Sequence, residues 1–313
     1  SYLKFEANEN YYKGEPSIKN VVFQIIENAD TAILALQNGE VDAYQMTPQQ
    51  VKKLDLDASN LSTYSYSEGR VGYLEINCNR VTDEKVRKAL LYAMDRKAMD
   101  DAAFESSEYY SIPYTFLPTN SQFYTEDGVE KYEQDVDKAK SMLEDAGVSG
   151  LKLKLGYMSS DAVQSAQALL IQEQLKEVGV TVELAGGDGT AIANAMKDPD
   201  NEYDMYLGGY IMGIDPDTFS SLFENDGAYN YMHYSGYDTI DQLFEEGRSK
   251  LDESARKETY AKLQAAVQDT GAFYPIISNN KILVVNNRIQ GVEDAGLVPV
   301  YTFEDTSSLK IAE

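Results

Sequence analysis

The sequence lacks several residue types on which many enzymes and metalloproteins depend. Its 313 residues include one cysteine, Cys78, one histidine, His233, and no tryptophan. A single cysteine excludes an internal disulfide and a cysteine-based metal cluster. A single histidine excludes histidine-rich metal sites, and a Ser-His catalytic triad would have to use His233. We therefore expect no bound metal and no cofactor.

Nucleotide-binding and esterase motifs are also missing. The sequence contains neither G-x-x-x-x-G-K-S/T nor G-x-S-x-G. The stretch Gly186–Gly189, GGDG, precedes a predicted helix, but no basic residue stands beside it, so it is a weak phosphate loop. Because the chain has 52 acidic residues, paired carboxylates arise by chance. A hydrolase that uses two carboxylates stays an alternative.

Positive charge is scarce. There are 27 Lys and Arg residues against 52 Asp and Glu, which gives a formal net charge of -25. Such a chain repels phosphate backbones, so we expect no nucleic-acid partner. No apolar run reaches the roughly 18 residues that a membrane-spanning helix needs. The hydrophobic fraction of 43% indicates a globular protein, and its 24 tyrosines supply the flat, amphipathic surface that suits ligand sites.

Hydrophobic periodicity predicts regularly alternating strands and helices in the middle of the chain. A β-α-β-α-β order is typical of a mostly parallel, doubly wound sheet with right-handed crossovers. This α/β pattern extends from residue 151 to residue 208. The expected elements are strands at 151–157, 180–184 and 203–207 and helices at 161–178 and 188–197.

The remaining periodicity predicts that the chain forms two lobes. Residues 1–77 would belong to the first lobe, residues 78–285 would form the lobe with the doubly wound sheet, and residues 286–313 would return to the first lobe. Two crossings between lobes form a hinge, with a ligand cleft between the lobes. The other expected elements are strands at 21–26, 41–44, 61–66, 71–77, 273–277 and 281–285, a single helix over 83–99, and helices beginning at Asp30, Thr47, Asp135, Tyr237 and Glu253.

The stretch Leu207–Phe223, LGGYIMGIDPDTFSSLF, is the centre of the predicted site. We expect the third strand to end in a sharp turn at Gly208 and Gly209. Asp215 would then cap a helix that has Pro216 in its first position. An ordinary strand-to-helix connection is the alternative, but ligands of open α/β sheets bind beyond the C-terminal ends of strands. The predicted wall of the ligand cleft comprises Tyr210, Ile211, Met212, Gly213 and Asp215.

Three residues outside this stretch are further candidates. Tyr231 and His233 follow the predicted helix closely and could reach the same cleft, where aromatic faces stack on peptide bonds, sugars or chelators. A lone histidine is more often a surface or capping residue. Arg70 lies near the first expected crossing between the lobes, which makes it a candidate for a ligand contact.

Five stretches occur in an order that matches a known family. The most specific is Asn77 followed by Asp83–Arg96, DEKVRKALLYAMDR, which is similar to the signature D-x-x-V-R-x-A-L-x-Y-A-I-D-R. The chain thereby resembles family 5 extracellular solute-binding proteins, the peptide-, nickel- and oligosaccharide-binding subunits of ABC importers. On this resemblance Asn77 joins the candidate ligand-binding residues. The other four stretches are Asn8–Gly14, Asp30–Asp42, Asp215–Phe219 and Asn230–Asp241.

This resemblance implies a fold, a function and a location. The fold would be periplasmic-binding-protein-like (type II), and the protein would bind a peptide-like small solute without acting as an enzyme. A nickel chelate or an oligosaccharide is the alternative ligand. The partners would be ABC permease subunits, and we expect a monomer at the cell surface, as a membrane-anchored lipoprotein, or in the periplasm. Family members begin with a lipoprotein signal and an extra domain, so we expect this chain to be the C-terminal portion.

One position departs from the peptide-binding relatives. In those proteins an acid three residues before the D-P turn holds the α-amino group of the ligand, whereas here that position is Met212. No charged residue lies between Tyr206 and Ile214. A buried ammonium without a partner loses several kcal/mol. Either the ligand is not held by a free amine, or Asp215, Asp217 or a further domain supplies the acid.

Overall fold

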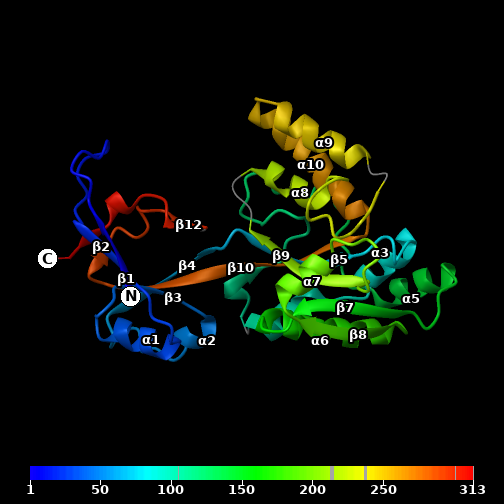
Figure 1. Ribbon diagram of the computed structural model, residues 1–313, viewed down its shortest axis with the longest axis horizontal. Helices are drawn as coiled ribbons and strands as arrows, with labels where there is room; N and C mark the ends of the chain where they lie inside the picture. Colours follow the sequence, from blue (N-terminus) through cyan, green and yellow to red (C-terminus); the bar gives the residue numbers. More distant parts are fainter. Residues whose placement is uncertain (105, 212–214, 236–237, 300, 313) are drawn as a thin grey trace. The chain divides into compact units, whose positions relative to one another are not determined.

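The structure is a computed structural model that describes residues 1–104, 106–211, 215–235, 238–299 and 301–312. The chain forms two compact units (Figure 1). Unit 1 contains Ser1–Glu68 and Asn280–Glu313, and unit 2 contains Gly69–Asn279. The sequence analysis placed these boundaries after residues 77 and 285, so strand β5 (Arg70–Ile76) belongs to unit 2 rather than to the first segment.

Unit 1 is built around the second half of strand β10 (Phe273–Asn286), which pairs antiparallel with β3 and with β4. A small core that includes Tyr66, Leu283 and Val285 packs against it. Helix α1 has Asn28 as its N-cap, not Asp30 as we expected, because the Asn28 side chain accepts from the Thr31 N–H. The elements are β1 (Tyr2–Glu6), β2 (Asn20–Gln24), α1 (Ala29–Gln37), β3 (Ala43–Met46), α2 (Pro48–Val51), β4 (Leu61–Ser67), β11 (Ile289–Gln290), β12 (Leu297–Val298), β13 (Thr302–Phe303), η3 (Thr306–Ser308) and β14 (Lys310–Ile311).

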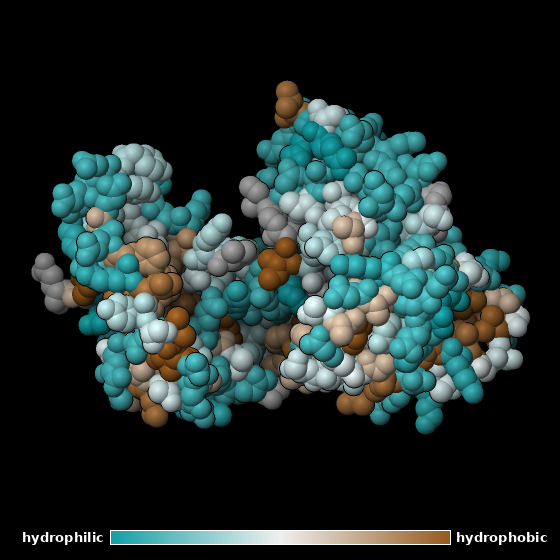
Figure 2. Space-filling model, in the orientation of Figure 1, coloured by the Kyte–Doolittle hydropathy of each residue, from teal (hydrophilic) through white to brown (hydrophobic). Residues whose placement is uncertain are grey.

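The β1–β2 hairpin of unit 1 is exposed along its whole length. Strand sequences rich in aromatic and β-branched residues normally bury at least one face. Here both strands leave apolar side chains in solvent, visible as brown atoms over this part of unit 1 in Figure 2. The exposed apolar residues of the hairpin and its flank are Tyr2, Leu3, Phe5, Val21, Val22, Phe23 and Ile25.

Unit 2 contains a mixed sheet with the strand order β10-β5-β9-β7-β8. Strand β7 is parallel to both β8 and β9, which confirms the predicted β-α-β-α-β arrangement. Strands β5 and β10 extend the sheet in antiparallel pairing. The elements are β5, α3 (Glu84–Tyr92), α4 (Arg96–Phe104), η1 (Ser107–Tyr109), β6 (Tyr110–Ser111), α5 (Val136–Asp145), β7 (Lys152–Met158), α6 (Ala162–Glu177), β8 (Thr181–Gly187), α7 (Gly189–Ala195), β9 (Met205–Ile211), η2 (Pro216–Phe219), α8 (Ser220–Phe223), α9 (Asp238–Ser249), α10 (Glu253–Asp269) and β10 (Phe273–Asn286).

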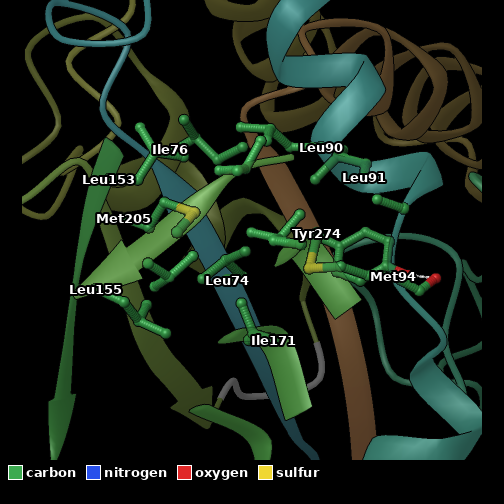
Figure 3. Close-up of a cluster of buried hydrophobic side chains, with 14 of the residues drawn as sticks. Leu74, Ile76, Leu90, Leu91, Met94, Leu153, Leu155, Ile171, Met205 and Tyr274 are labelled. Atoms are coloured by element: carbon green, nitrogen blue, oxygen red, sulfur yellow. Dashed lines mark hydrogen bonds between the residues drawn. The ribbon is translucent and has the colours of Figure 1, made fainter. Parts of the chain in front are cut away.

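Helices cover both faces of this sheet. Figure 1 shows α8, α9 and α10 on one side of the unit 2 strands and α6 on the other. Side chains alternate between the faces of a strand, so Leu74 and Ile76 of β5 enter one core while Val71 and Tyr73 enter the other. Figure 3 shows the first core, in which side chains of β5, β7 and β9 meet Leu90, Leu91 and Ile171 of the covering helices.

Two predictions of element boundaries are wrong. The single helix expected over 83–99 is two helices, α3 and α4, because the Asp95 carboxylate accepts from the Ala98 N–H at 3.1 Å and so starts a second helix. The two strands expected at 273–277 and 281–285 are one strand, β10, because Ser278 pairs with Ser111 of β6 and Asn280 with Ser67 of β4. No helix within the described parts of the chain is long and apolar enough to cross a membrane.

Candidate ligand-binding site

The glycines that we expected in a turn lie inside strand β9. Gly208 is opposite Tyr73 and Gly209 is opposite Gly72, in a register that extends to the pair Arg70–Ile211. The prediction of a turn at Gly208 is therefore wrong. The cause is β5, which offers β9 a partner over its full length and so outweighs the weak strand propensity of glycine.

Each of the two glycines makes room for a side chain on a different face of the sheet. A Cβ atom at Gly208 would lie 2.6 Å from Cε2 of the Tyr73 ring. A Cβ atom at Gly209 would lie 1.9 Å from Nη2 and 2.2 Å from Cζ of Arg70. Because neighbouring residues of a strand face opposite sides, the ring covers one face of the sheet here and the guanidinium covers the other.

The C-terminal end of β9 and the start of β5 opposite it present one cationic and one apolar side chain, Arg70 of β5 and Ile211 of β9. Arg70 is half-buried, and its Nη1 atom also lies 3.2 Å from the position of a Cβ on Gly72. Gly209 is exposed, and 46% of the Ile211 surface is in solvent. This end of the strand can therefore contact a ligand through a guanidinium, an isoleucine and accessible backbone.

Tyr210 belongs to the opposite face of β9. Its ring centroid lies 5.4 Å from that of Phe219, and its hydroxyl is 3.4 Å from the Thr218 carbonyl oxygen and from Ser221 Oγ. The residue is half-buried against the second core. Tyr210 thus has a packing role in unit 2 and also a partly accessible ring.

Asp215 caps helix η2, as expected, and forms an ion pair. Its side chain accepts from the Asp217 N–H at 3.0 Å, and both carboxylate oxygens lie 2.8 Å from Arg256 Nη2. Burial alone would raise the pKa of Asp215, but the hydrogen bonds from Arg256 and the Asp217 N–H outweigh burial and lower it. Asp217 pairs in turn with Arg248 at 3.0 Å. The predicted site residues Met212 and Gly213 lie outside the described residues.

Tyr231 and His233 lie near the start of β9 rather than its end. The Tyr231 ring centroid is 5.9 Å from that of Tyr206, and His233 Nε2 is 2.7 Å from the Met196 carbonyl oxygen. The Arg70 guanidinium lies over Gly209, and the strand rises about 10 Å between Tyr206 and Gly209. Because Tyr206 and Gly209 face opposite sides of β9, Tyr231 and Arg70 lie on opposite faces of the strand. Tyr231 and His233 both line a cavity of about 400 Å³ together with Asn79, Lys197, Pro199, Asn225, Asp226, Gly227, Ala228, Asn230, Tyr234 and Ser235.

Asn77 is fully buried and shapes the turn that follows β5. Its backbone N–H donates to the Asp204 carbonyl at 2.9 Å, and its Oδ1 accepts from the Asn79 N–H at 3.0 Å. The Nδ2 atom has no hydrogen-bond partner among the described residues. These contacts place Asn77 beside the first residues of β9.

Glu75 is a buried polar residue that the sequence analysis missed. It is completely buried opposite Tyr206, and neither carboxyl oxygen has a hydrogen-bond partner within the described ranges. Burial raises the pKa of Glu75 well above its ordinary value, and burial together with Glu75 raises the pKa of Tyr206 to about 12. A protonated carboxyl can donate one hydrogen bond and accept others. The signal in the sequence was a single acid inside the apolar strand VGYLEI.

Comparison with known proteins identifies the family. The family of bacterial extracellular solute-binding proteins, family 5 (middle region), matches residues 1–231. The chain belongs to this family of solute-binding proteins. This result confirms the resemblance that the sequence motifs indicated.

Individual relatives agree with the family match. Oligopeptide-binding protein AppA of Bacillus subtilis is 26% identical over 313 aligned residues, which cover 91% of this chain and 55% of AppA. The structure of the ABC transporter substrate-binding protein CtaP from Listeria monocytogenes has a TM-score of 0.93 and 36% identity, covering 100% of this chain and 64% of CtaP. The putative peptide-binding protein AppA from Clostridium difficile has a TM-score of 0.90 and 32% identity, covering 99% of this chain and 65% of that protein. The chain thus spans just over half to two-thirds of the length of these relatives.

Proposed function

We propose that this chain is part of the solute-binding component of an ABC importer and that it binds an oligopeptide or a related small solute without altering it. The observation that carries the proposal is the match to CtaP over the whole chain at 36% identity. Relatives whose names specify oligopeptides or peptides support the choice of ligand class. The protein would work outside the cytoplasm, either as a surface lipoprotein or in the periplasm, as a monomer that meets ABC permease subunits.

The connectivity of the units suits such a role. The chain passes from unit 1 to unit 2 once, at Glu68–Gly69, and returns once, at Asn279–Asn280. In two-lobe binding proteins a few residues at such crossings absorb the rotation that closes the lobes on a ligand. The ligand must prefer the closed state, because equal affinity for both states shifts no population. The cleft expected between the lobes stays a prediction.

The contacts that unit 2 would provide are those at the end of β9. Ile211 supplies apolar surface, Arg70 supplies a charge, and the exposed backbone at Gly209 supplies hydrogen-bonding groups. An extended peptide can use backbone groups of this kind together with alternate side-chain contacts. Peptides therefore fit this end of the strand better than ligands that need several metal-coordinating side chains.

A ligand screen tests the proposal. The protein would be heated with pools of tri- to pentapeptides, with malto-oligosaccharides and with nickel–histidine, while its unfolding temperature is recorded. A peptide at about one hundred times its Kd stabilises the folded state by about 2.7 kcal/mol, or about 5 °C. Mass spectrometry of the bound fraction should recover the peptide intact.

Three outcomes would overturn the proposal. A shift with nickel–histidine alone or with sugars alone would replace peptides by another ligand class. A peptide recovered in cleaved form would indicate a hydrolase. The absence of any shift with every peptide pool would remove the peptide-binding function from this chain.

A further inference from the structure

Arg70 differs from every other arginine in the chain. The other six hydrogen-bond to carboxylate or carbonyl oxygens, such as Asp204, Thr270 and Asp215. The Arg70 side chain forms no hydrogen bond and no ion pair with any residue that the structure describes, although the chain has 52 acidic residues against 27 basic ones. The half-buried Arg70 guanidinium, which has no ion-pair partner among the described residues, can therefore bind an anionic group of a ligand.

The guanidinium of Arg70 lies over a pair of glycines. The glycine pair Gly72–Gly209 leaves no side chain beneath it, and a Cβ at Gly209 would lie within 1.9–2.6 Å of its Nη2, Cζ and Nε atoms. The planar group thus lies against the two strands instead of extending freely into solvent. Gly209 and Ile211 beside it are exposed, so a ligand can approach from solvent.

The acids that stand near this end of β9 already have cationic partners, and Glu68 lies 3.8 Å from Lys281. No charged residue lies between Tyr206 and Ile214, and Asp215 is already paired with Arg256. The net charge of -25 repels an anionic ligand at long range. An anion bound here must therefore be retained by a local partner. A guanidinium matches the two oxygens of a carboxylate in a bidentate arrangement.

We propose that Arg70 binds a carboxylate of the ligand, so that the solute is recognised through this carboxylate and not selected by its amine. This inference rests on the proposed peptide-binding function and adds a specificity-determining residue to it. The carboxylate has two possible sources, the C-terminus of a peptide or an Asp or Glu side chain, and the test separates them.

The test uses three pentapeptide pools with each protein variant. The first pool lacks Asp and Glu and has a free C-terminus, the second lacks them and is C-terminally amidated, and the third is amidated but contains Asp and Glu. Thermal shift and native mass spectrometry report binding to wild type, Arg70→Gln and Arg70→Lys. Lys152→Gln is the charge-matched control. Lys152 is exposed at the start of β7, so this substitution removes one positive charge elsewhere in unit 2.

We expect wild type and Lys152→Gln to bind a carboxylate-bearing pool at least tenfold more tightly than the second pool. Arg70→Gln should bind all pools equally weakly. Arg70→Lys should keep part of the preference for carboxylate-bearing pools, because lysine retains the positive charge but lacks the bidentate geometry of the guanidinium. If Arg70→Gln does not fold, a partial loss of the preference for carboxylate-bearing pools in Arg70→Lys supports the inference, and an unchanged preference overturns it. Equal binding of the second pool by wild type, or a preference that persists without Arg70, would overturn the inference and leave peptide binding intact. No binding of any pool would overturn the proposed function and this inference together.

Discussion

Asp100 provides the sharpest test of the electrostatics of unit 2. This residue of α4 is completely buried, its Oδ1 lies 3.4 Å from Gln167 Nε2, and its Oδ2 has no hydrogen-bond partner among the described residues. Burial raises the pKa of Asp100 from 3.8 to about 8, while Gln167 and Arg96 oppose the shift only in part. Folding at neutral pH therefore requires this carboxyl to take up a proton.

The sign of the pH dependence follows from this shift. Because the folded-state pKa exceeds the unfolded value, Asp100 contributes its full stability below about pH 4 and loses it as the pH rises to about 8. The slope is at most about 1.4 kcal/mol per pH unit, so the loss between pH 5 and pH 8 is at most about 4 kcal/mol. Asparagine has the shape of the protonated acid. Asp100→Asn should match wild type near pH 4 and exceed its free energy of unfolding by several kcal/mol at pH 8.

Urea denaturation at pH 5, 6, 7 and 8 measures this difference. Asp101→Asn is the matched control, because Asp101 is the exposed neighbour and pairs with Lys97 and Tyr110. These hydrogen bonds, with that of Lys97 the stronger, lower the pKa of Asp101, so its contribution is present at neutral pH and is lost as the pH falls. If the free energies of unfolding of wild type and Asp100→Asn differ by the same amount at every pH, the reasoning is refuted. An Asp100→Asn protein that is less stable than wild type at pH 8 would also refute it.

Two further predictions concern strand β9. Gly208→Ala should lower the free energy of unfolding by about 1–3 kcal/mol, because its Cβ meets the packed Tyr73 ring at 2.6 Å. Gly209→Ala meets only the movable end of the Arg70 side chain and should lower it less. Urea unfolding measures both variants, and a larger loss of stability in Gly209→Ala would contradict this. Tyr210→Phe should change stability by less than about 1 kcal/mol, since the hydroxyl contacts are 3.4 Å long, while Tyr210→Ala should cost more through lost packing on Phe219. Equal stability of these two variants would show that the ring does not support the core.

Elements with local capping signals could be predicted from the sequence. Helix α6 begins after Asp161 and ends at Glu177, with Val178 as its C-cap, close to the expected bounds, because Asp161 accepts from two N–H groups of the first turn and Gly179 has a positive φ. Helix α5 is likewise bounded by Asp135 and Ala146. These signals are contained in the sequence immediately around each helix end, so no tertiary information is needed to recognise them.

The extent of strands and the grouping of site residues could not be predicted in this way. Strand β9 continues through two glycines because β5 pairs with it, and this register is a long-range property. The same register places Tyr231, beside Tyr206, and the Arg70 guanidinium, over Gly209, on opposite faces of β9. Sequence spacing does not show on which face of a strand a later loop will pack.

The open β1–β2 hairpin has a consequence for the behaviour of the protein in solution. Apolar side chains that are exposed on both faces of this hairpin favour association between copies of the protein. What opposes this is mutual repulsion between molecules that each carry a formal charge of -25. Dissolved ions shorten the reach of that repulsion to about 10 Å at 0.1 M. Colloidal stability should therefore decline as ionic strength increases, and dilute buffer is the medium in which this chain best stays dispersed.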